Sequence, residues 1–145
     1  MKILAFSTIL LAAGFFLFSC KHTRYTPVDL PAKQLQWGAG GGFTGKETTY
    51  LLLENGQIFK RDGVGALLQE LEGTKKKTAQ SLFKTADTLD IIKMDFMHPG
   101  NTYSFLEMRT AENAKRIAWG DTKFPVTEQM QNLYKQLMQL VAPKK

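Results

Sequence analysis

Glycine is dense near the start of the chain, at Gly38, Gly40, Gly41, Gly42 and Gly45. This spacing satisfies the G-x-G-x-x-G pattern of dinucleotide-binding loops and, with Lys46, all but the last position of the phosphate-binding P-loop. The first pattern needs a helix directly after the glycines, because the pyrophosphate binds at a helix N-terminus, but residues 48–51 are strand formers. The second needs Ser or Thr after the lysine, where this chain has Glu47. We therefore expect no nucleotide as cofactor or partner.

Side chains that could carry hydrolytic or metal chemistry are sparse. Asp95, His98 and Ser104 are close in sequence and could be drawn as a catalytic triad, but no nucleophile-elbow pattern surrounds Ser104. A solvated carboxylate, a turn histidine and a strand serine explain the same residues. A metal site needs several converging ligands, and the chain has two histidines and one cysteine. The sequence thus predicts a protein that is not an enzyme and has no metal or other cofactor.

The first nineteen residues have the pattern of an export signal. Lys2 supplies a positive start, and residues 3–18 form an almost unbroken apolar run that is too short for a permanent membrane span. The run ends in Leu-Phe-Ser-Cys, which resembles the lipobox of bacterial lipoproteins, with Cys20 as the acylated residue. The alternative is an ordinary signal peptide followed by an incidental cysteine. The resemblance implies cleavage before Cys20 and a lipid anchor, and Lys21 directly after the cysteine implies the outer membrane.

This organisation predicts a signal peptide over residues 1–19, a lipidated cysteine with a tether over 20–32, and a single domain over 33–145. The tether is polar and contains two prolines, which is typical of a spacer. The whole chain carries a formal charge of +6. Outside the cytoplasm this charge does not indicate nucleic acid. It could attract anionic lipid or an acidic partner, but by default it is solvated surface, including the run at residues 75–77.

Residues 34–60 predict a strand, a glycine turn, a second strand, a tight turn and a third strand. Leu35 and Trp37 share one strand face because side chains alternate with period two. Asn55 and Gly56 predict a type I′ hairpin turn, in which both residues have positive φ.

The remaining chain predicts two helices and further strands. Residues 66–71 fit a strand or a short helix equally well. A helix is expected over about 78–89 with Thr78 as its N-cap, and a closing helix over about 127–141 with its cap at or near Thr127. Between them, residues 90–97 are expected to be extended, and 102–109 and 115–119 to be strands. The predicted fold class is α+β, with an antiparallel sheet of about four to six strands and both helices on one side.

Phe43 is the aromatic residue whose role the pattern leaves open, because it lies inside the glycine turn. It could project as an anchor for a partner's pocket, or it could fold back as a plug over the sheet. The turn itself consists of Gly41, Gly42, Phe43, Thr44 and Gly45, which are the candidate partner-binding residues.

These five residues, followed by a strand, a helix, a Pro-Gly-Asn turn, a Trp-Gly-Asp segment and a closing amphipathic helix, resemble the emfourin type of small bacterial proteins. That resemblance implies inhibition of thermolysin-like metallopeptidases by occlusion. Residues 41–44 would present extended backbone to the protease cleft, with Phe43 in a hydrophobic pocket. We expect a lipid-anchored envelope protein that binds an unidentified partner, with metallopeptidase inhibition as the alternative and an enzyme as a distant third.

Overall fold

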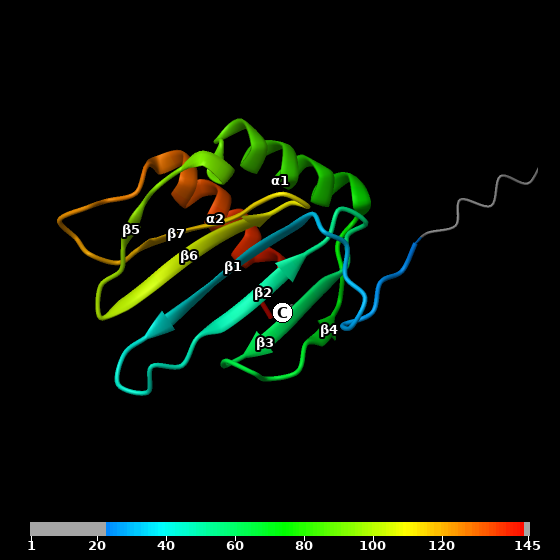
Figure 1. Cartoon of the computed structure of the whole chain (residues 1–145), viewed down its shortest axis with the longest axis horizontal. Coiled ribbons are helices and arrows are strands. Elements are labelled where there is room, and N and C mark those ends of the chain that lie inside the picture. Colours follow the sequence, from blue (N-terminus) through cyan, green and yellow to red (C-terminus); the bar gives the residue numbers. More distant parts are fainter. Residues whose placement is uncertain (1–22, 144–145) are drawn as a thin grey trace, which may run out of the picture.

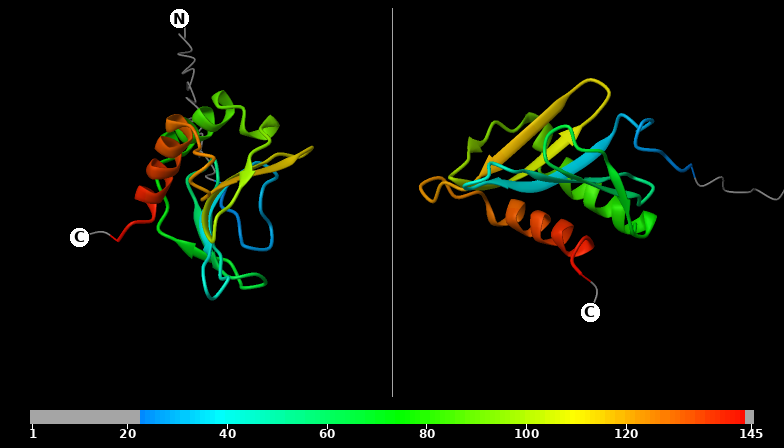
Figure 2. Two further views of the ribbon diagram at one scale, coloured as in Figure 1. Left: turned by 90° about the vertical axis from the view of Figure 1, so that its left-hand side faces the viewer. Right: turned by 90° about the horizontal axis from the view of Figure 1, so that it is seen from below.

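The computed structural model describes residues 23–143, which form one sheet with two helices on one of its faces (Figures 1 and 2). The predicted signal peptide and Cys20 lie outside the described residues. The strands are β1 (Gln34–Gly41), β2 (Thr48–Leu52), β3 (Ile58–Asp62), β4 (Gln69–Leu71), β5 (Met97–His98), β6 (Thr102–Arg109) and β7 (Ala114–Trp119). The helices are α1 (Lys76–Thr88), the 3-10 turn η1 (Ile91–Lys93) and α2 (Glu128–Leu140).

The seven strands lie in the order β4-β3-β2-β1-β6-β7-β5, with β1 at the centre. The predicted α+β class, with both helices on one side, is confirmed. Two details differ from the prediction. The sheet has seven strands instead of four to six, and it is mixed, because β5 runs parallel to β7 while every other pair is antiparallel. β4 and β5 have three and two residues, too few to show an alternating pattern.

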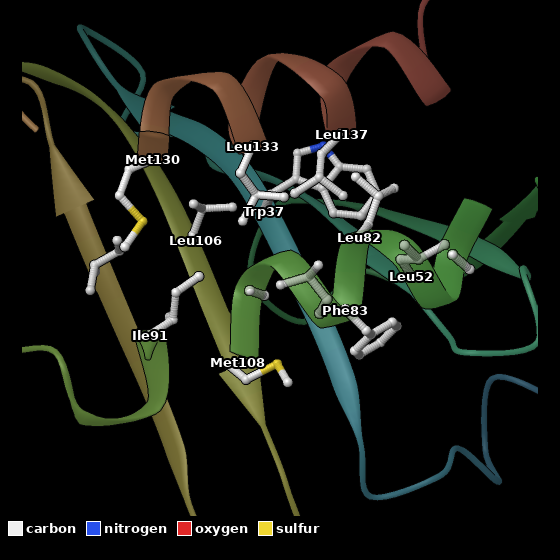
Figure 3. Packing of buried hydrophobic residues seen from close by; sticks show 14 of the residues in the cluster. Trp37, Leu52, Leu82, Phe83, Ile91, Leu106, Met108, Met130, Leu133 and Leu137 are labelled. Carbon is white, nitrogen blue, oxygen red and sulfur yellow. The ribbon is translucent and has the colours of Figure 1, made fainter. Parts of the chain in front are cut away.

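The main core lies between the sheet and the helices. Leu35 and Trp37 of β1 face the helices, and β6 places Met108 and Leu106 directly beside them. Figure 3 shows the apolar side chains of α1 and α2 pointing toward these strand residues. The residues that the two helices bury are Ala79, Leu82, Phe83, Ala86, Met130, Leu133 and Leu137. Their spacing, mostly of three and four residues, places them on one stripe of each helix, as is typical of a helix that covers a sheet.

Helix α2 begins as predicted, and helix α1 does not. The Thr127 hydroxyl accepts a hydrogen bond from Met130 N at 3.4 Å, so Thr127 is the N-cap of α2. The predicted cap Thr78 is wrong for α1: the cap position is Lys75, and no side chain caps this helix. The polar pattern alone could not distinguish a threonine cap from a threonine within the first turn.

The turn at Asn55 and Gly56 is not the predicted type I′. Gly56 has φ +95°, but Asn55 is not among the residues with positive φ. Gly56 N donates to Leu53 O at 2.9 Å, and Leu53 N donates to Gln57 O at 3.0 Å. This is a three-residue loop in which a type I turn is followed by a left-handed glycine. The Asn55 carboxamide accepts from Gln57 N at 2.9 Å, which favours this arrangement.

The described part of the predicted tether, residues 23–32, packs against the domain. The side chains of Tyr25 and Leu30 cover a second apolar cluster, formed by Leu51, Leu53 and Phe59 on the face of the sheet away from the helices. Gln57 fixes the segment through its side chain, which accepts from Tyr25 N at 2.7 Å and donates to Tyr25 O at 3.0 Å. The tether expectation therefore does not hold for these residues, because they bury apolar surface that composition alone did not reveal.

Candidate binding surface at the glycine turn

The predicted glycine turn is a hydrogen-bonded β-turn between β1 and β2. Gly45 N donates to Gly42 O at 3.2 Å, which closes the turn with Phe43 and Thr44 at its two central positions. Gly42 N donates to Asn101 O at 2.7 Å and so ties the turn to the loop before β6. β2 begins at Thr48, and no helix follows the glycines. The geometry that a dinucleotide loop requires is therefore not present here.

Two of the glycines are required by different features of the backbone. Gly41 has φ +89°, and a Cβ atom there would overlap the carbonyl oxygen of Asn101. Gly45 has φ +59° with open space around the Cβ position. The first glycine thus permits both an unusual dihedral angle and a close backbone approach, whereas the second serves the dihedral angle alone.

Phe43 projects fully into solvent, with a relative accessibility of 107 %. The alternative that it folds back as a plug over the sheet is wrong. The expectation that residues 41–44 present extended backbone is also wrong, because Phe43 lies at the tip of a β-turn. A turn of this kind presents one side chain to a partner and does not offer a strand for pairing.

A network of charged side chains supports the second stem of the turn on the helix-free face. The Glu47 carboxylate accepts hydrogen bonds from Tyr103 Oη at 2.8 Å, Arg116 Nη1 at 3.0 Å and Thr49 Oγ1 at 3.2 Å. Arg116 Nε also donates to Glu107 at 2.7 Å, and the Arg116 guanidinium stacks 3.9 Å from the centre of the Phe105 ring. The stem of the turn is thereby connected to β6 and β7.

Glu47 can reach across β1 because two β1 residues have no side chain on this face. A Cβ atom at Gly40 would lie 2.7 Å from Tyr103 Oη and 3.1 Å from Glu47 Cβ. A Cβ atom at Gly38 would lie 2.9 Å from the Phe105 ring. These glycines leave room for the ring and for the carboxylate. This arrangement was not predicted; the signal for it in the sequence is glycine alternating with larger residues along the first predicted strand.

The electrostatics of the network follow from burial and pairing. Burial would raise the pKa of Glu47, but hydrogen bonds from Tyr103 and Arg116, with the charge of Arg116, outweigh it and hold this pKa below its ordinary value. Burial would lower the pKa of Arg116, but its bonds to Glu107 and Glu47 raise it. The hydrogen bond to Glu47 is the main cause of a raised pKa at Tyr103. Glu47 and Arg116 are therefore both charged at neutral pH, and the Tyr103 hydroxyl keeps the proton that it donates to Glu47.

Other exposed apolar side chains lie at the same end of the sheet as Phe43. Val64 and Leu67 belong to the loop between β3 and β4 and are 101 % and 92 % exposed. The register pairs Thr48 with Asp62, and Gly63 N donates to Glu47 O at 2.8 Å, so this loop begins beside the stem of the glycine turn. Phe124, in the loop after β7, is about half exposed. The exposure of these three residues was not predicted from the sequence.

A shallow hollow of about 510 Å³ lies beside the glycine turn. It is lined by Ala39, Gly40, Gly41, Lys46, Thr102, Tyr103, Ser104, Trp119 and Gly120. The surface at this end of the molecule therefore combines a projecting aromatic ring with an adjacent concave, mixed polar surface. A projecting side chain beside a concave surface is suited to contact with another protein.

The residues of the rejected triad have separate structural roles. Asp95 forms an ion pair with Lys115 at 3.0 Å. The His98 ring stacks on Phe124 with centroids 4.1 Å apart and meets the edge of Phe96 at 4.8 Å. Ser104 lies on β6 opposite Ala39 of β1. Residues 23–143 contain no group of three His, Cys, Asp or Glu side chains placed to hold a metal ion.

Comparison with known proteins adds no assignment: no protein-family model matches the chain, and no curated protein sequence matches it. Cys20, the predicted lipidation site, lies outside the described residues. Among residues 23–143, neither long helix has the length and apolar character needed to cross a bilayer.

Proposed function

We propose that this chain is a lipid-anchored protein of the cell envelope that binds a partner protein through its glycine turn and does not catalyse a reaction. Its partner-binding residues are Gly41, Gly42, Phe43, Thr44 and Gly45. The anchor is Cys20, acylated after removal of residues 1–19, and the residue that follows the cysteine favours the outer membrane.

The observation that carries the proposal is the complete exposure of Phe43 on a turn fixed at both stems. An exposed aromatic ring loses contact with water when it enters a partner's pocket, and aromatic residues dominate binding energy at many interfaces. Asn101 holds the first stem and Glu47 holds the second. A turn that is ordered before binding loses less conformational entropy on association than a mobile loop does.

Site-specific photo-crosslinking in the envelope tests this proposal. A photoreactive residue at position 43 should give a discrete adduct with one protein. The matched control is position 28, because Val28 is 96 % exposed but lies in the N-terminal segment. Equal adducts from both positions, or an adduct at 43 that persists when Gly41→Ala distorts the turn, would contradict the proposal.

The second candidate function is inhibition of thermolysin-type metallopeptidases, and the presentation of Phe43 favours it specifically. A single apolar ring on a rigid turn could fill the hydrophobic specificity pocket of such an enzyme and block its cleft without covalent chemistry. The measurement is the hydrolysis of a peptide by a thermolysin-like enzyme in the presence of the mature chain. Inhibition should be lost with Phe43→Ala and retained with Val28→Ala. If the peptide were hydrolysed at the full rate in the presence of micromolar unmodified chain, inhibition would be contradicted and partner binding alone would stand.

A further inference from the structure

The start of the described chain lies at the end of the sheet opposite Phe43. Thr23 O accepts a hydrogen bond from Asn55 Nδ2 at 2.7 Å, in the turn between β2 and β3. The glycine turn lies at the other end of β2, beyond Thr48. Figure 1 shows the N-terminal segment and the β1–β2 loop at opposite ends of the sheet. Because β1 has eight residues, these ends are about 27 Å apart along a strand.

The lysine run lies at this same end. Thr74 N donates to Gly56 O at 2.8 Å, so the residues that lead into α1 are attached to the turn that holds Thr23. Lys76 lines a hollow together with Thr23 and Asn55. We define the anchor pole as the surface formed by Thr23, the Asn55–Gly56 turn and Lys75–Lys77.

The three lysines of the anchor pole are exposed, and none of their ammonium groups has a hydrogen bond or ion pair with another residue of the described chain. The other basic side chains near the pole are paired. Arg24 contacts Glu70 at 2.9 Å, and Lys33 contacts Asp87 at 3.2 Å. Lys33 also contacts Glu54 at 3.3 Å, and Glu72 adds one further negative charge close by in sequence. These residues carry five positive and four negative charges, a formal surplus of +1, and Lys75, Lys76 and Lys77 supply it.

These lysines are unfavourable for the helix that they begin. The N-terminus of a helix carries partial positive charge and favours acidic side chains. The first turn of α1 contains no acidic residue, and no side chain caps it. Residues that oppose the local stability of an element are often found at functional sites, so these lysines are candidates for contact with a partner outside the domain.

The chain length between this pole and the proposed anchor is short. Cys20 is three residues before Thr23, and three residues of extended chain span at most about 10 Å. An acylated Cys20 would therefore hold the anchor pole close to the bilayer. Basic residues near an anionic membrane surface are attracted to it, with about a fivefold preference for each Lys or Arg.

We propose that the anchor pole lies directly against a bilayer surface containing anionic phospholipid, with Lys75, Lys76 and Lys77 on the head groups and Phe43 turned away from the membrane. This inference rests on the lipid anchor of the proposed function. With a formal surplus of one positive charge at this pole, the bilayer would favour this orientation about fivefold over random tumbling about the anchor. The turn bearing Phe43 then meets proteins in the compartment and does not meet the bilayer.

The test uses the mature acylated chain on vesicles whose phosphatidylcholine head groups carry a nitroxide quencher. Cys20 is the only cysteine, so one introduced cysteine can be labelled selectively with a fluorophore. Gln80→Cys reports on the anchor pole, since Gln80 shares the hollow with Thr23 and Lys76, and Thr44→Cys reports on the glycine turn. In vesicles of equal phosphatidylcholine and phosphatidylglycerol, the label at position 80 should be quenched severalfold more than the label at position 44. Without phosphatidylglycerol, or in high salt, this difference should fall.

Charge reversal identifies the residues responsible. K75E/K76E/K77E should make the quenching at positions 80 and 44 equal, whereas the matched reversal K46E/K123E/K135E should leave the difference in place. The melting temperature of K75E/K76E/K77E should equal or exceed that of the unmodified chain, because acidic side chains stabilise the N-terminus of a helix. K75Q/K76Q/K77Q gives the same test if the acidic variant does not fold.

Two failures can be distinguished. A chain that does not float with vesicles overturns the lipid anchor and this inference together. A chain that floats but shows equal quenching at both positions, or quenching unchanged by reversal of the three lysines, overturns this inference alone. A crosslinker at position 80 separates one more outcome. If reversal of the three lysines abolished crosslinks to a protein but left the quenching unchanged, the lysines would bind an acidic protein, and this inference would also be overturned.

Discussion

Glu47 at the start of the β2 stem and Arg116 on β7 form an ion pair at 3.0 Å although 69 positions separate them in sequence. Strands β1 and β6 lie between β2 and β7, and the contact is possible because Gly40 has no side chain above β1. This relationship links the turn that presents Phe43 to the opposite half of the sheet, and the first two predictions follow from it.

Arg116→Ala should destabilise the protein by about 2–3 kcal/mol. The change leaves two largely buried carboxylates, Glu47 and Glu107, without their shared partner, and removing one member of a buried ion pair is costly. It also removes the stacking on Phe105. Urea unfolding measures the loss. Arg109→Ala is the control, since Arg109 pairs with Glu107 alone and is half exposed; it should cost less than about 1 kcal/mol. Equal losses from the two variants would contradict the role given to Arg116.

The stability contribution of Glu47 should depend on pH. Because its pKa in the folded protein lies below the ordinary value, its contribution is complete above the unfolded pKa of about 4.3 and is lost as pH falls through the folded pKa. At about pH 6, Glu47→Gln should reduce the free energy of unfolding by about 1–3 kcal/mol. At about pH 3 the difference between the two proteins should be much smaller. A gap that stays constant over this range would show that the carboxylate charge is not what stabilises the turn.

Two alanine substitutions separate the roles of the glycines in the turn. Gly45→Ala should cost about 1–2 kcal/mol, the penalty for a left-handed non-glycine residue with open space around it. Gly41→Ala should cost at least about 1 kcal/mol more, because its Cβ also overlaps the Asn101 carbonyl. Thermal unfolding of both variants checks the order. If Gly45→Ala were the more damaging change, the close approach to Asn101 would not be what requires a glycine at position 41.

Gln57→Ala should release the N-terminal segment from the domain. The Gln57 carboxamide makes both hydrogen bonds to the Tyr25 backbone, and each lost bond costs about 1 kcal/mol. Trypsin cleavage after Arg24 should therefore become about ten- to a hundredfold faster. Gln69→Ala on the exposed strand β4 is the control and should cleave at the original rate. Cleavage that is already rapid in the unmodified chain would show that the segment is not held.

The length and pattern of the elements decide how much of the fold could be predicted. β6 and α2 were predicted closely, because eight alternating strand residues and a long amphipathic stripe give strong periodic signals. β4, β5 and η1 have two or three residues each and carry no such signal. The start of α1 was misplaced because its cap is a lysine and has no side-chain hydrogen bond. The candidate turn itself was located from its glycines, which only a few backbone geometries require.

The sequence by itself determined the α+β class, the strand–turn–strand path of residues 34–60 and the candidate turn around Phe43. Periodicity and glycine content are local properties and can be found without knowing the contacts. Only the tertiary structure decided that Phe43 points into solvent, that Glu47 reaches Arg116 across β1, and that Lys76 lies beside Thr23 at the far end of the sheet. These relationships join residues distant in sequence, and they arise from strand order and register, which no local pattern specifies.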